Sequence, residues 1–426
     1  MRSYRELFRA PEFTPLFLTS CLQSAALTIG GLALATAVYA RTGSPFFTAL
    51  SMFGPSIAQM LGATLLLSAA DRLPPRAATA GAALCSAALM ALLAVPAFPV
   101  WAVFLVLLGM GLVSSVAGGI RGGLLTDVVP EHAYLLGRSA LNIANGTMQI
   151  CGFAAGGVLV AVLSPAETQL IGAGLFLTAG LVARFGLSSR PARAAGRPSP
   201  AATWRVNRQL WSVPAVRPVY LALWVPNGLI VGCEALFVPY APSGAGLLLA
   251  ASAVGMLAGD VVAGRFLSPG LRRRLGPYLR LLLAVPYLLF ALNLPMPIAA
   301  LAVAVAAVGY SSTLLLQERL IELTPPQVRG QALGLHGSGM QTMQAAGAAL
   351  AGGTAEFLGA GPAIVVMAVA SILVTLALAP ALKTRQGARM HGVDRQQEAA
   401  DGIDDRGDRR QFGRGPGGRE AVRRPR

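Results

Sequence analysis

The sequence predicts an all-α integral membrane protein, with twelve transmembrane helices in two pseudo-symmetric bundles of six. The first observation is composition: 54% of the 426 residues are hydrophobic and 12% are charged, which is not typical of a soluble domain. The second is a series of apolar segments of about 18–25 residues, because a hydrocarbon core of about 30 Å needs roughly 20 apolar residues per helix. The third is an internal repeat, described below.

Twelve apolar segments follow one another along the chain, and each predicts one membrane span. The first follows an arginine-containing start, but its apolar stretch is too long for a signal peptide, so it is expected to be a retained span. An even number of spans places both termini on the same side of the membrane. The predicted spans are 13–39, 46–70, 77–95, 100–122, 138–163, 169–187, 218–239, 244–264, 277–293, 297–317, 331–357 and 361–382.

Arginines occupy alternate gaps between these spans and predict the orientation. Short loops rich in positive residues stay on the cytoplasmic side of the membrane. The chain is therefore expected to cross the cell (inner, cytoplasmic) membrane with both termini in the cytoplasm. The net charge of +16 then reflects topology, the C-terminal tail and attraction to anionic lipid, without a nucleic-acid partner. The arginines that carry this signal are Arg2, Arg5, Arg9, Arg72, Arg76, Arg265, Arg272 to Arg274, Arg329 and those of the segment 184–217.

Composition divides the chain into four parts. Residues 1–187 form an N-terminal six-helix bundle, 188–217 a cytoplasmic linker rich in Arg, Pro, Ala and Ser, and 218–382 a C-terminal six-helix bundle. The tail 383–426 lacks hydrophobic periodicity and is expected to be disordered.

The two bundles also resemble each other in sequence. Thr-Met-Gln at 147–149 recurs at 342–344, and Gly152 matches Gly347 at the same offset. Several matches at a nearly constant offset indicate an internal duplication. Two six-helix repeats joined by a cytoplasmic linker are the plan of transporters that rock two halves around a central site.

At this point the chain resembles the major facilitator superfamily, over about residues 10–382. Asp-Arg-Leu-Pro-Pro-Arg at 71–76 is similar to that family's loop signature Asp-Arg-x-Gly-Arg-Arg, with prolines replacing the glycine and one arginine. The segment 255–265 is similar to its degenerate second copy. Gly152, Gly156 and Gly157 resemble the antiporter signature Gly-Pro-x-x-Gly-Gly, with Phe153 in place of the proline. The similarity is greatest to bacterial drug-efflux-type proton antiporters.

In that family the loop latches one conformational state, which implies a latch and gate in this chain. Arg121 is expected to pair with Asp71, because it lies near the inner end of span 100–122. Breaking such a partly buried ion pair leaves an unpaired charge and shifts a two-state balance. The alternative is a set of topology anchors at helix ends. The latch and gate candidates are Asp71, Arg72, Arg76, Arg121, Asp260 and Arg265.

Two titratable side chains within predicted spans are candidates for proton coupling. Glu234 lies about 16 residues, or roughly 24 Å along a helix axis, from the inner end of its span. A charged group at such depth is costly and usually faces a cavity, pairs or exchanges a proton. Alternatively it lies near the outer headgroups, since Pro239 and Tyr240 follow. His336, inside span 331–357, changes charge near neutral pH, although a hydrogen-bonded packing or boundary histidine is the favoured interpretation.

Polar side chains at helical spacing predict the lining of a substrate cavity. One stripe lies in span 138–163 and a second in span 331–357. Such side chains point away from lipid, either into a cavity or toward a neighbouring helix as interhelical hydrogen bonds. The stripe residues are Asn142, Asn145, Gln149, Ser338, Gln341 and Gln344, and the isolated mid-span candidates are Gln23, Gln59 and Asn227.

These features favour a secondary transporter that moves a small molecule by alternating access, and no enzyme. The sequence contains no Gly-x-x-x-x-Gly-Lys-Ser/Thr loop for an ATP-driven pump, and no His-Glu-x-x-His or paired membrane aspartates for a membrane enzyme. The partial antiporter signature favours proton-coupled efflux of a lipophilic molecule by a functional monomer, without cofactor or metal. Uptake of a neutral metabolite, and a non-transporting sensor on the same fold, are the alternatives.

Overall fold

Apolar segments in a bilayer become helices because every backbone polar group must be bonded within its own segment. The computed structural model describes residues 4–65, 73–95, 98–130, 133–191, 207–208, 210–325 and 328–382, and the regular structure of these residues is helical. Within them, ten helices are long and apolar enough to cross a membrane. α3 and α16, with 21 and 30 residues, are also long enough, so the prediction of twelve spans fits the structure.

The helices of the first half begin and end close to the predicted spans. Pro75 and Pro165 occupy the first positions of α5 and α8, where a missing backbone N–H costs nothing. α6 extends six residues beyond the predicted end at 122. The elements are α1 (Tyr4–Leu7), α2 (Phe13–Thr42), α3 (Pro45–Leu65), α5 (Pro75–Leu93), α6 (Val100–Val128), α7 (Tyr134–Val162) and α8 (Pro165–Gly186).

The helices of the second half are less regular than the sequence predicts. The predicted span 277–293 is divided, because Pro286 removes a backbone donor and the chain continues as a 3-10 helix, which is followed by Asn293 with φ 46°. The elements are α10 (Arg217–Ala235), α11 (Phe237–Tyr240), α12 (Ala245–Val261), the π-helix η2 (Val262–Phe266), α13 (Pro269–Leu282), the 3-10 helices η3 (Val285–Leu292) and η4 (Gly309–Ser311), α14 (Met296–Val308), α15 (Ser312–Leu323), α16 (Arg329–Leu358) and a last span, Ala360–Leu382.

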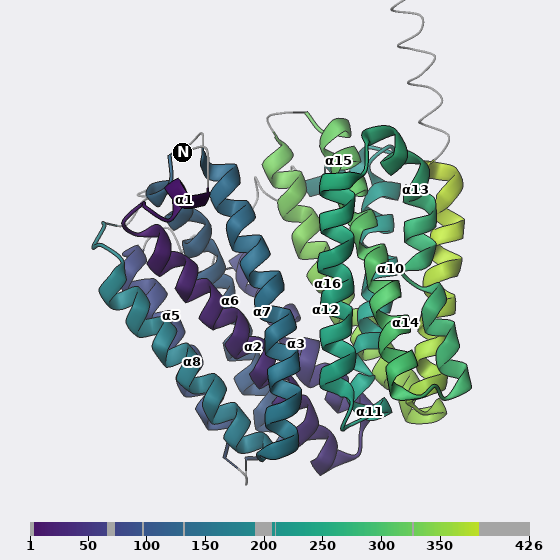
Figure 1. The fold of residues 1–426 in the computed structure, drawn as a ribbon, viewed down its shortest axis with the longest axis horizontal. Coiled ribbons are helices and arrows are strands. Elements are labelled where there is room, and N and C mark those ends of the chain that lie inside the picture. The colour runs from purple at the N-terminus through teal and green to yellow at the C-terminus, as the bar shows by residue number, and fades with distance from the viewer. Residues whose placement is uncertain are drawn as a thin grey trace, which may run out of the picture. The chain divides into compact units, whose positions relative to one another are not determined.

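Most helix contacts lie within each half. α2 packs against α7 and α8, α5 against α6 and α8, and α3 against α6, whereas α10 packs against α16 and α12 against α14 (Figure 1). The most extensive contacts between the halves join α3 with α16 and α7 with α12, and smaller ones join α3 with α10 and α11 with α2 and α3. Large apolar side chains on the outer faces, among them Leu105, Val162 and Leu301, are more than half exposed, as expected for helices that face lipid.

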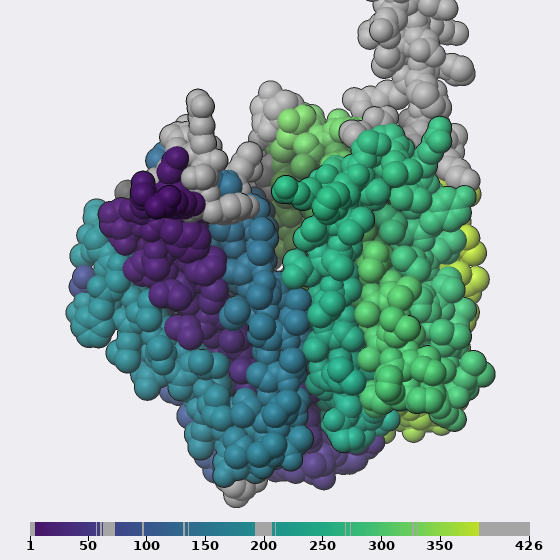
Figure 2. Space-filling view, in the orientation of Figure 1, coloured from purple at the N-terminus to yellow at the C-terminus, as the bar shows by residue number. Residues whose placement is uncertain are grey.

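The two halves touch closely where the end of α7 meets the start of α12. Gly157 of α7 faces Gly246 of α12 so tightly that a Cβ at position 246 would lie 2.5 Å from the Gly157 Cα. Figure 2 shows the blue surface of α7 against the teal surface of α12 in the lower part of the view. Glu356 of α16 accepts hydrogen bonds from the Ser44 hydroxyl and from the Phe46 backbone N–H, which ties α16 to the start of α3.

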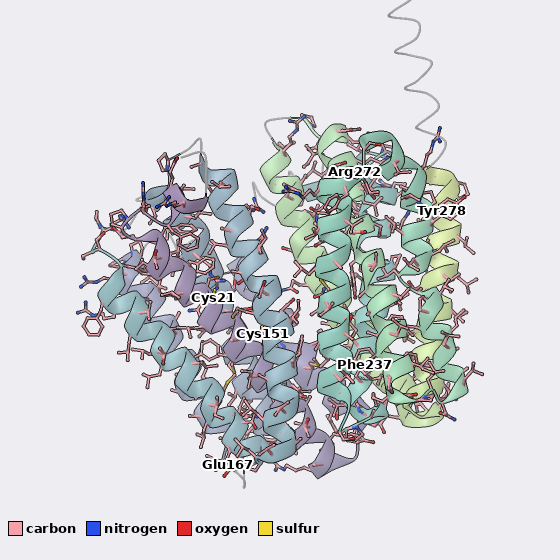
Figure 3. All side chains as sticks on the ribbon, in the orientation of Figure 1. Cys21, Cys151, Glu167, Phe237, Arg272 and Tyr278 are labelled. Atoms are coloured by element: carbon pink, nitrogen blue, oxygen red, sulfur yellow. The ribbon has the colours of Figure 1, made fainter. Side chains whose placement is uncertain are left out.

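Charged side chains lie at the two ends of this bundle, and Figure 3 shows Arg272 and Glu167 at opposite ends. Glu167 closes a capping box with Ser164 at the start of α8. Just before α2, the Glu12 carboxylate accepts two hydrogen bonds from Arg190, at 2.7 and 2.9 Å, and others from Ser188. Burial by itself raises the pKa of Glu12, but these hydrogen bonds and the Arg190 charge outweigh it, and the pKa lies below its ordinary value.

Candidate functional site

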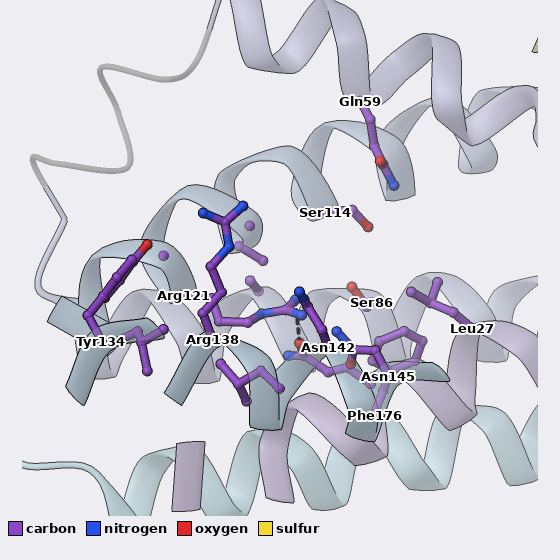
Figure 4. A pocket seen from close by; sticks show the side chains of 17 residues that line it. Leu27, Gln59, Ser86, Ser114, Arg121, Tyr134, Arg138, Asn142, Asn145 and Phe176 are labelled. Carbon is purple, nitrogen blue, oxygen red and sulfur yellow. Dashed lines mark hydrogen bonds between the residues drawn. The ribbon is translucent and has the colours of Figure 1, made fainter. Parts of the chain in front are cut away.

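A polar pocket lies among the helices of the first half. It has a volume of about 510 Å³ and is lined by side chains of α2, α3, α5, α6, α7 and α8 (Figure 4). Four of the predicted cavity residues line it, namely Gln23, Gln59, Asn142 and Asn145. The other polar lining residues are Ser86, Ser114, Arg121, Tyr134 and Arg138.

Arg121 of α6 is held in this pocket by neutral acceptors. Its Nη2 donates to Gln23 Oε1 at 3.1 Å, and its Nη1 donates to Ser20 Oγ at 3.3 Å. Ser20 Oγ in turn donates to Asn145 Oδ1 at 3.2 Å, so the network joins α2, α6 and α7. No carboxylate among the described residues therefore pairs with this guanidinium.

The predicted latch around Arg121 stays a prediction. Asp71 and Arg72 lie outside the described residues. Arg76 is half-buried in the first turn of α5. On the second loop, Asp260 is half-buried near the end of α12, and Arg265 is exposed in η2.

A described ion pair does lie beside this second loop. Arg272 Nη1 is 3.1 Å from Glu318 Oε1, which connects α13 with α15. The same guanidinium donates to the carbonyl oxygens of Gly264, at 2.8 Å, and Leu267, at 2.9 Å. Sequence reasoning used Arg272 only as a topology signal, because the partner lies 46 residues away.

The remaining cavity candidates lie in other environments. Gln341 Nε2 donates to Gln59 Oε1 at 2.8 Å, so α16 of the second half reaches the rim of the pocket. Asn227 is buried, and its Nδ2 donates to the Leu223 carbonyl and to Thr313 Oγ1, which joins α10 to α15. Neither Gln341 nor Asn227 lines the pocket itself, and the same holds for the last three candidates, Gln149, Ser338 and Gln344.

Glu234 is buried in the second half, between three elements. It lies on α10 and is 9% exposed. Ser252 Oγ of α12 donates to its Oε1 at 2.5 Å, and the Tyr310 hydroxyl of η4 donates to the same oxygen at 3.4 Å. Within the described residues no arginine forms an ion pair with this carboxylate, so hydroxyl groups are its partners.

His336 lies in a separate buried position on α16. Its Nε2 is 3.0 Å from Gln317 Nε2 of α15, and its backbone carbonyl accepts a hydrogen bond from Trp224 Nε1 at 3.0 Å. Trp224 stacks on Tyr220 and Trp211, with ring centroids 4.8 and 5.8 Å away. The histidine is thus surrounded by packing contacts of α10, α15 and α16.

The three antiporter-like glycines allow α7 to approach its neighbours. A Cβ at Gly152 would lie 2.9 Å from the Thr28 Cβ, and one at Gly156 would lie 3.3 Å from the Ile29 Cα, both on α2. Gly157 points the other way, toward Gly246 of α12. The segment therefore serves close helix packing inside the first half and between the halves.

Sequence reasoning missed Ser20, Tyr134 and Arg138 of the first site and Ser252 and Tyr310 of the second. Arg138 had the one available signal, because it is an arginine at the predicted start of span 138–163. Hydroxyl groups carry no comparable signal, since serine and tyrosine occur throughout membrane helices.

Comparison with known proteins identifies the fold. No family profile and no curated protein matches the sequence. Among solved structures, the nucleoside transporter NupG superposes with a TM-score of 0.68 at 16% identity, covering 87% of this chain and 99% of that chain.

Two further solved structures are similar. A POT family transporter in complex with 5-aminolevulinic acid has a TM-score of 0.68 at 11% identity, covering 87% of this chain and 96% of that chain. A bacterial homologue of the human lysosomal transporter Spinster, inward-facing and unoccupied, has a TM-score of 0.63 at 13% identity, covering 90% and 95%. The chain therefore has the all-helical membrane fold of the major facilitator superfamily.

Proposed function

We propose that this protein is a secondary transporter that carries a small molecule across a membrane by alternating access and couples this movement to protons through Glu234. The observation that carries the proposal is the carboxylate of Glu234, buried inside a membrane helix with hydroxyl partners. The similar solved structures, described as a nucleoside transporter, a POT family transporter and a Spinster homologue, support the transport function.

The energetics of Glu234 support a proton as the coupled ion. Burying a charge without a paired cation is costly, so the carboxylate must gain a proton, a cation or contact with water at some stage of the cycle. Ser252 and Tyr310 can hydrogen-bond the side chain in both protonation states, because a hydroxyl group both donates and accepts. A proton can therefore enter and leave without a change of partners.

The contacts between the halves support alternating access. Opening the end of the bundle at α11 requires Gly157 to leave Gly246 and Glu356 to leave Ser44 and Phe46. These contacts involve glycines and one carboxylate, and they lie beside apolar packing of α3 against α16. A bound substrate can shift such an equilibrium only by its difference in affinity for the two arrangements, and a change of protonation in Glu234 adds a second difference.

We propose efflux as the direction, because the glycine segment of α7 resembles an antiporter signature. Inverted membrane vesicles with an inside-acid proton gradient test it directly. Lipophilic cations, neutral antibiotics, sugars, nucleosides and organic anions are added in turn, and collapse of the gradient is followed with a pH-sensitive dye. Glu234→Gln is compared with Glu167→Gln, a matched control at an exposed capping position where glutamine is also tolerated.

Collapse that depends on the compound, is abolished by Glu234→Gln and is retained in Glu167→Gln is the expected result. Collapse that survives in Glu234→Gln would remove Glu234 from the mechanism. Proton movement together with the compound, in vesicles of the native orientation, would assign uptake instead. Without any compound-dependent proton movement in either orientation, while the protein is folded, proton coupling is ruled out.

A further inference from the structure

We infer that the pocket of the first half binds an oxyanion, the carboxylate or phosphoryl group of an organic substrate, through Arg121 and Arg138. This inference rests on the proposed transport function and names the substrate class. It departs from the lipophilic substrate that the sequence favours.

The charge of the pocket carries the inference. Its described lining contains two arginines and no aspartate or glutamate, and the other polar lining side chains are amides and hydroxyl groups. Guanidinium groups are always charged in proteins, so the described lining is positively charged and holds no carboxylate to balance it. A cationic compound would be repelled there, whereas an anion would neutralise it.

Arg121 is oriented but not saturated. A guanidinium has five N–H groups, and Arg121 uses two of them on Gln23 and Ser20. These two hydrogen bonds hold the side chain in place before any ligand arrives, and a dashed line at Arg121 in Figure 4 marks one of them. The other N–H groups, without acceptors among the described residues, suit the paired oxygens of a carboxylate or phosphate.

Arg138 supplies a second positive charge from α7. Its side chain is exposed and forms no hydrogen bond or ion pair with any described residue. In Figure 4 its guanidinium stands apart from that of Arg121, in the same pocket. The two side chains therefore suit different oxygens of one ligand, or one anion at successive positions along its path.

The rest of the lining describes the body of the ligand. A volume of about 510 Å³ is typical of small-molecule sites. Leu27, Leu125, Leu141 and Phe176 form apolar parts of the wall. An organic anion with a flat apolar body fits this combination better than an inorganic ion does.

Binding to compounds of equal shape and different charge tests the inference. Isothermal titration calorimetry of the full chain in phosphatidylcholine nanodiscs is carried out with indole-3-acetate, indole-3-acetamide and tryptamine, and with benzoate and benzamide. The variants are Arg121→Gln, Arg121→Lys and Arg138→Gln, with Arg184→Gln as the control, because Arg184 is exposed in the last turn of α8, outside the pocket.

The expected result is that at least one anion binds about tenfold more tightly than its amide, with tryptamine weakest, and that this ratio falls to about one in Arg121→Gln. Arg121→Lys gives an intermediate ratio, since it keeps the charge but not the paired donors. Arg138→Gln reduces the ratio by about threefold, and Arg184→Gln leaves it unchanged. Amide binding persists in every variant, which shows that the pocket is folded.

Three results would overturn the inference. The first is equal binding of each anion and its amide by the unmodified protein. The second is an equal loss of anion and amide binding in Arg121→Gln, which would assign this arginine to the latch. The third is that the unmodified protein loses indole-3-acetate binding in phosphatidylglycerol nanodiscs, whereas Arg121→Gln does not. This result would assign the pocket to lipid headgroups. These titrations use no gradient, so a failure of transport leaves their outcome distinguishable.

Discussion

Replacing Gly347 with alanine is expected to destabilise the second half, because α10 and α16 touch at this glycine. A Cβ at position 347 would lie 1.9 Å from the carbonyl oxygen of Gly228 and 2.5 Å from its carbon, whereas ordinary contacts begin at 3.4 Å. Both are backbone atoms, so no side chain can rotate away. The helices must separate by about 1.5 Å locally, which removes much of the dispersion energy of that contact.

The magnitude follows from overpacking. Extra methyl groups in a well-packed core cost about 1–3 kcal/mol, and a contact between two backbones falls at the upper end of this range. We therefore expect the free energy of unfolding to fall by about 3 kcal/mol, which corresponds to a drop of roughly 5–10 °C in the unfolding temperature.

Thermal unfolding of the purified protein in detergent, followed by tryptophan fluorescence, measures this change. Trp224 is a local reporter, because it lies on α10 and stacks on Trp211 and Tyr220. Gly353→Ala is the matched control on the same helix: its Cβ would meet nothing within 4 Å, so about 0.5–1 kcal/mol of stabilisation is expected. Equal unfolding temperatures for the two variants would refute the close contact of α10 and α16.

Three further predictions concern other parts of the molecule. The Glu12–Arg190 pair contributes about 1 kcal/mol of stability, as expected for partly exposed groups. This contribution is fully present above the ordinary pKa of 4.5 and is lost as pH falls through the lower pKa of the folded state. Comparing the unfolding of Glu12→Gln with that of the unmodified protein between pH 3 and 7 measures it, and a difference in stability that does not change with pH would contradict it. Gly246→Val should slow transport at least about tenfold without loss of folding, because α7 and α12 can no longer close; flux at the unmodified rate would show that the contact is dispensable. Tyr310→Phe should reduce the compound-driven proton flux about threefold, since it removes one hydrogen bond to the Glu234 carboxylate. A flux equal to that of the unmodified protein would argue against this contact.

Much of the fold could be predicted from the sequence because the bilayer acts on each segment separately. A segment of about 20 apolar residues becomes a spanning helix whatever its neighbours are. The prediction was less accurate where local geometry depends on particular residues: the segment around Pro286 continues as a 3-10 helix, and the span predicted at 244–264 closes with the π-helix Val262–Phe266.

The candidate site could be predicted only in part. Glu234 was recognisable because a carboxylate within an apolar span is conspicuous in a sequence. Its partners were not, because Ser252 and Tyr310 lie 18 and 76 residues away and are ordinary residues for a membrane helix. Gln23 and Asn145 were candidates individually, but their network through Arg121 and Ser20 was not foreseen.

The sequence by itself determined that the chain is helical and membrane-embedded, since burial in lipid depends on local composition. Only the tertiary structure decided which polar side chains meet: it brings Ser20 to Asn145 across 125 residues and gathers two arginines into a pocket that holds no described acid. The physical reason is that interhelical hydrogen bonds and pocket charge depend on how helices are rotated and packed against each other. Local composition does not specify that rotation, whereas glycine contacts such as that between positions 157 and 246 do.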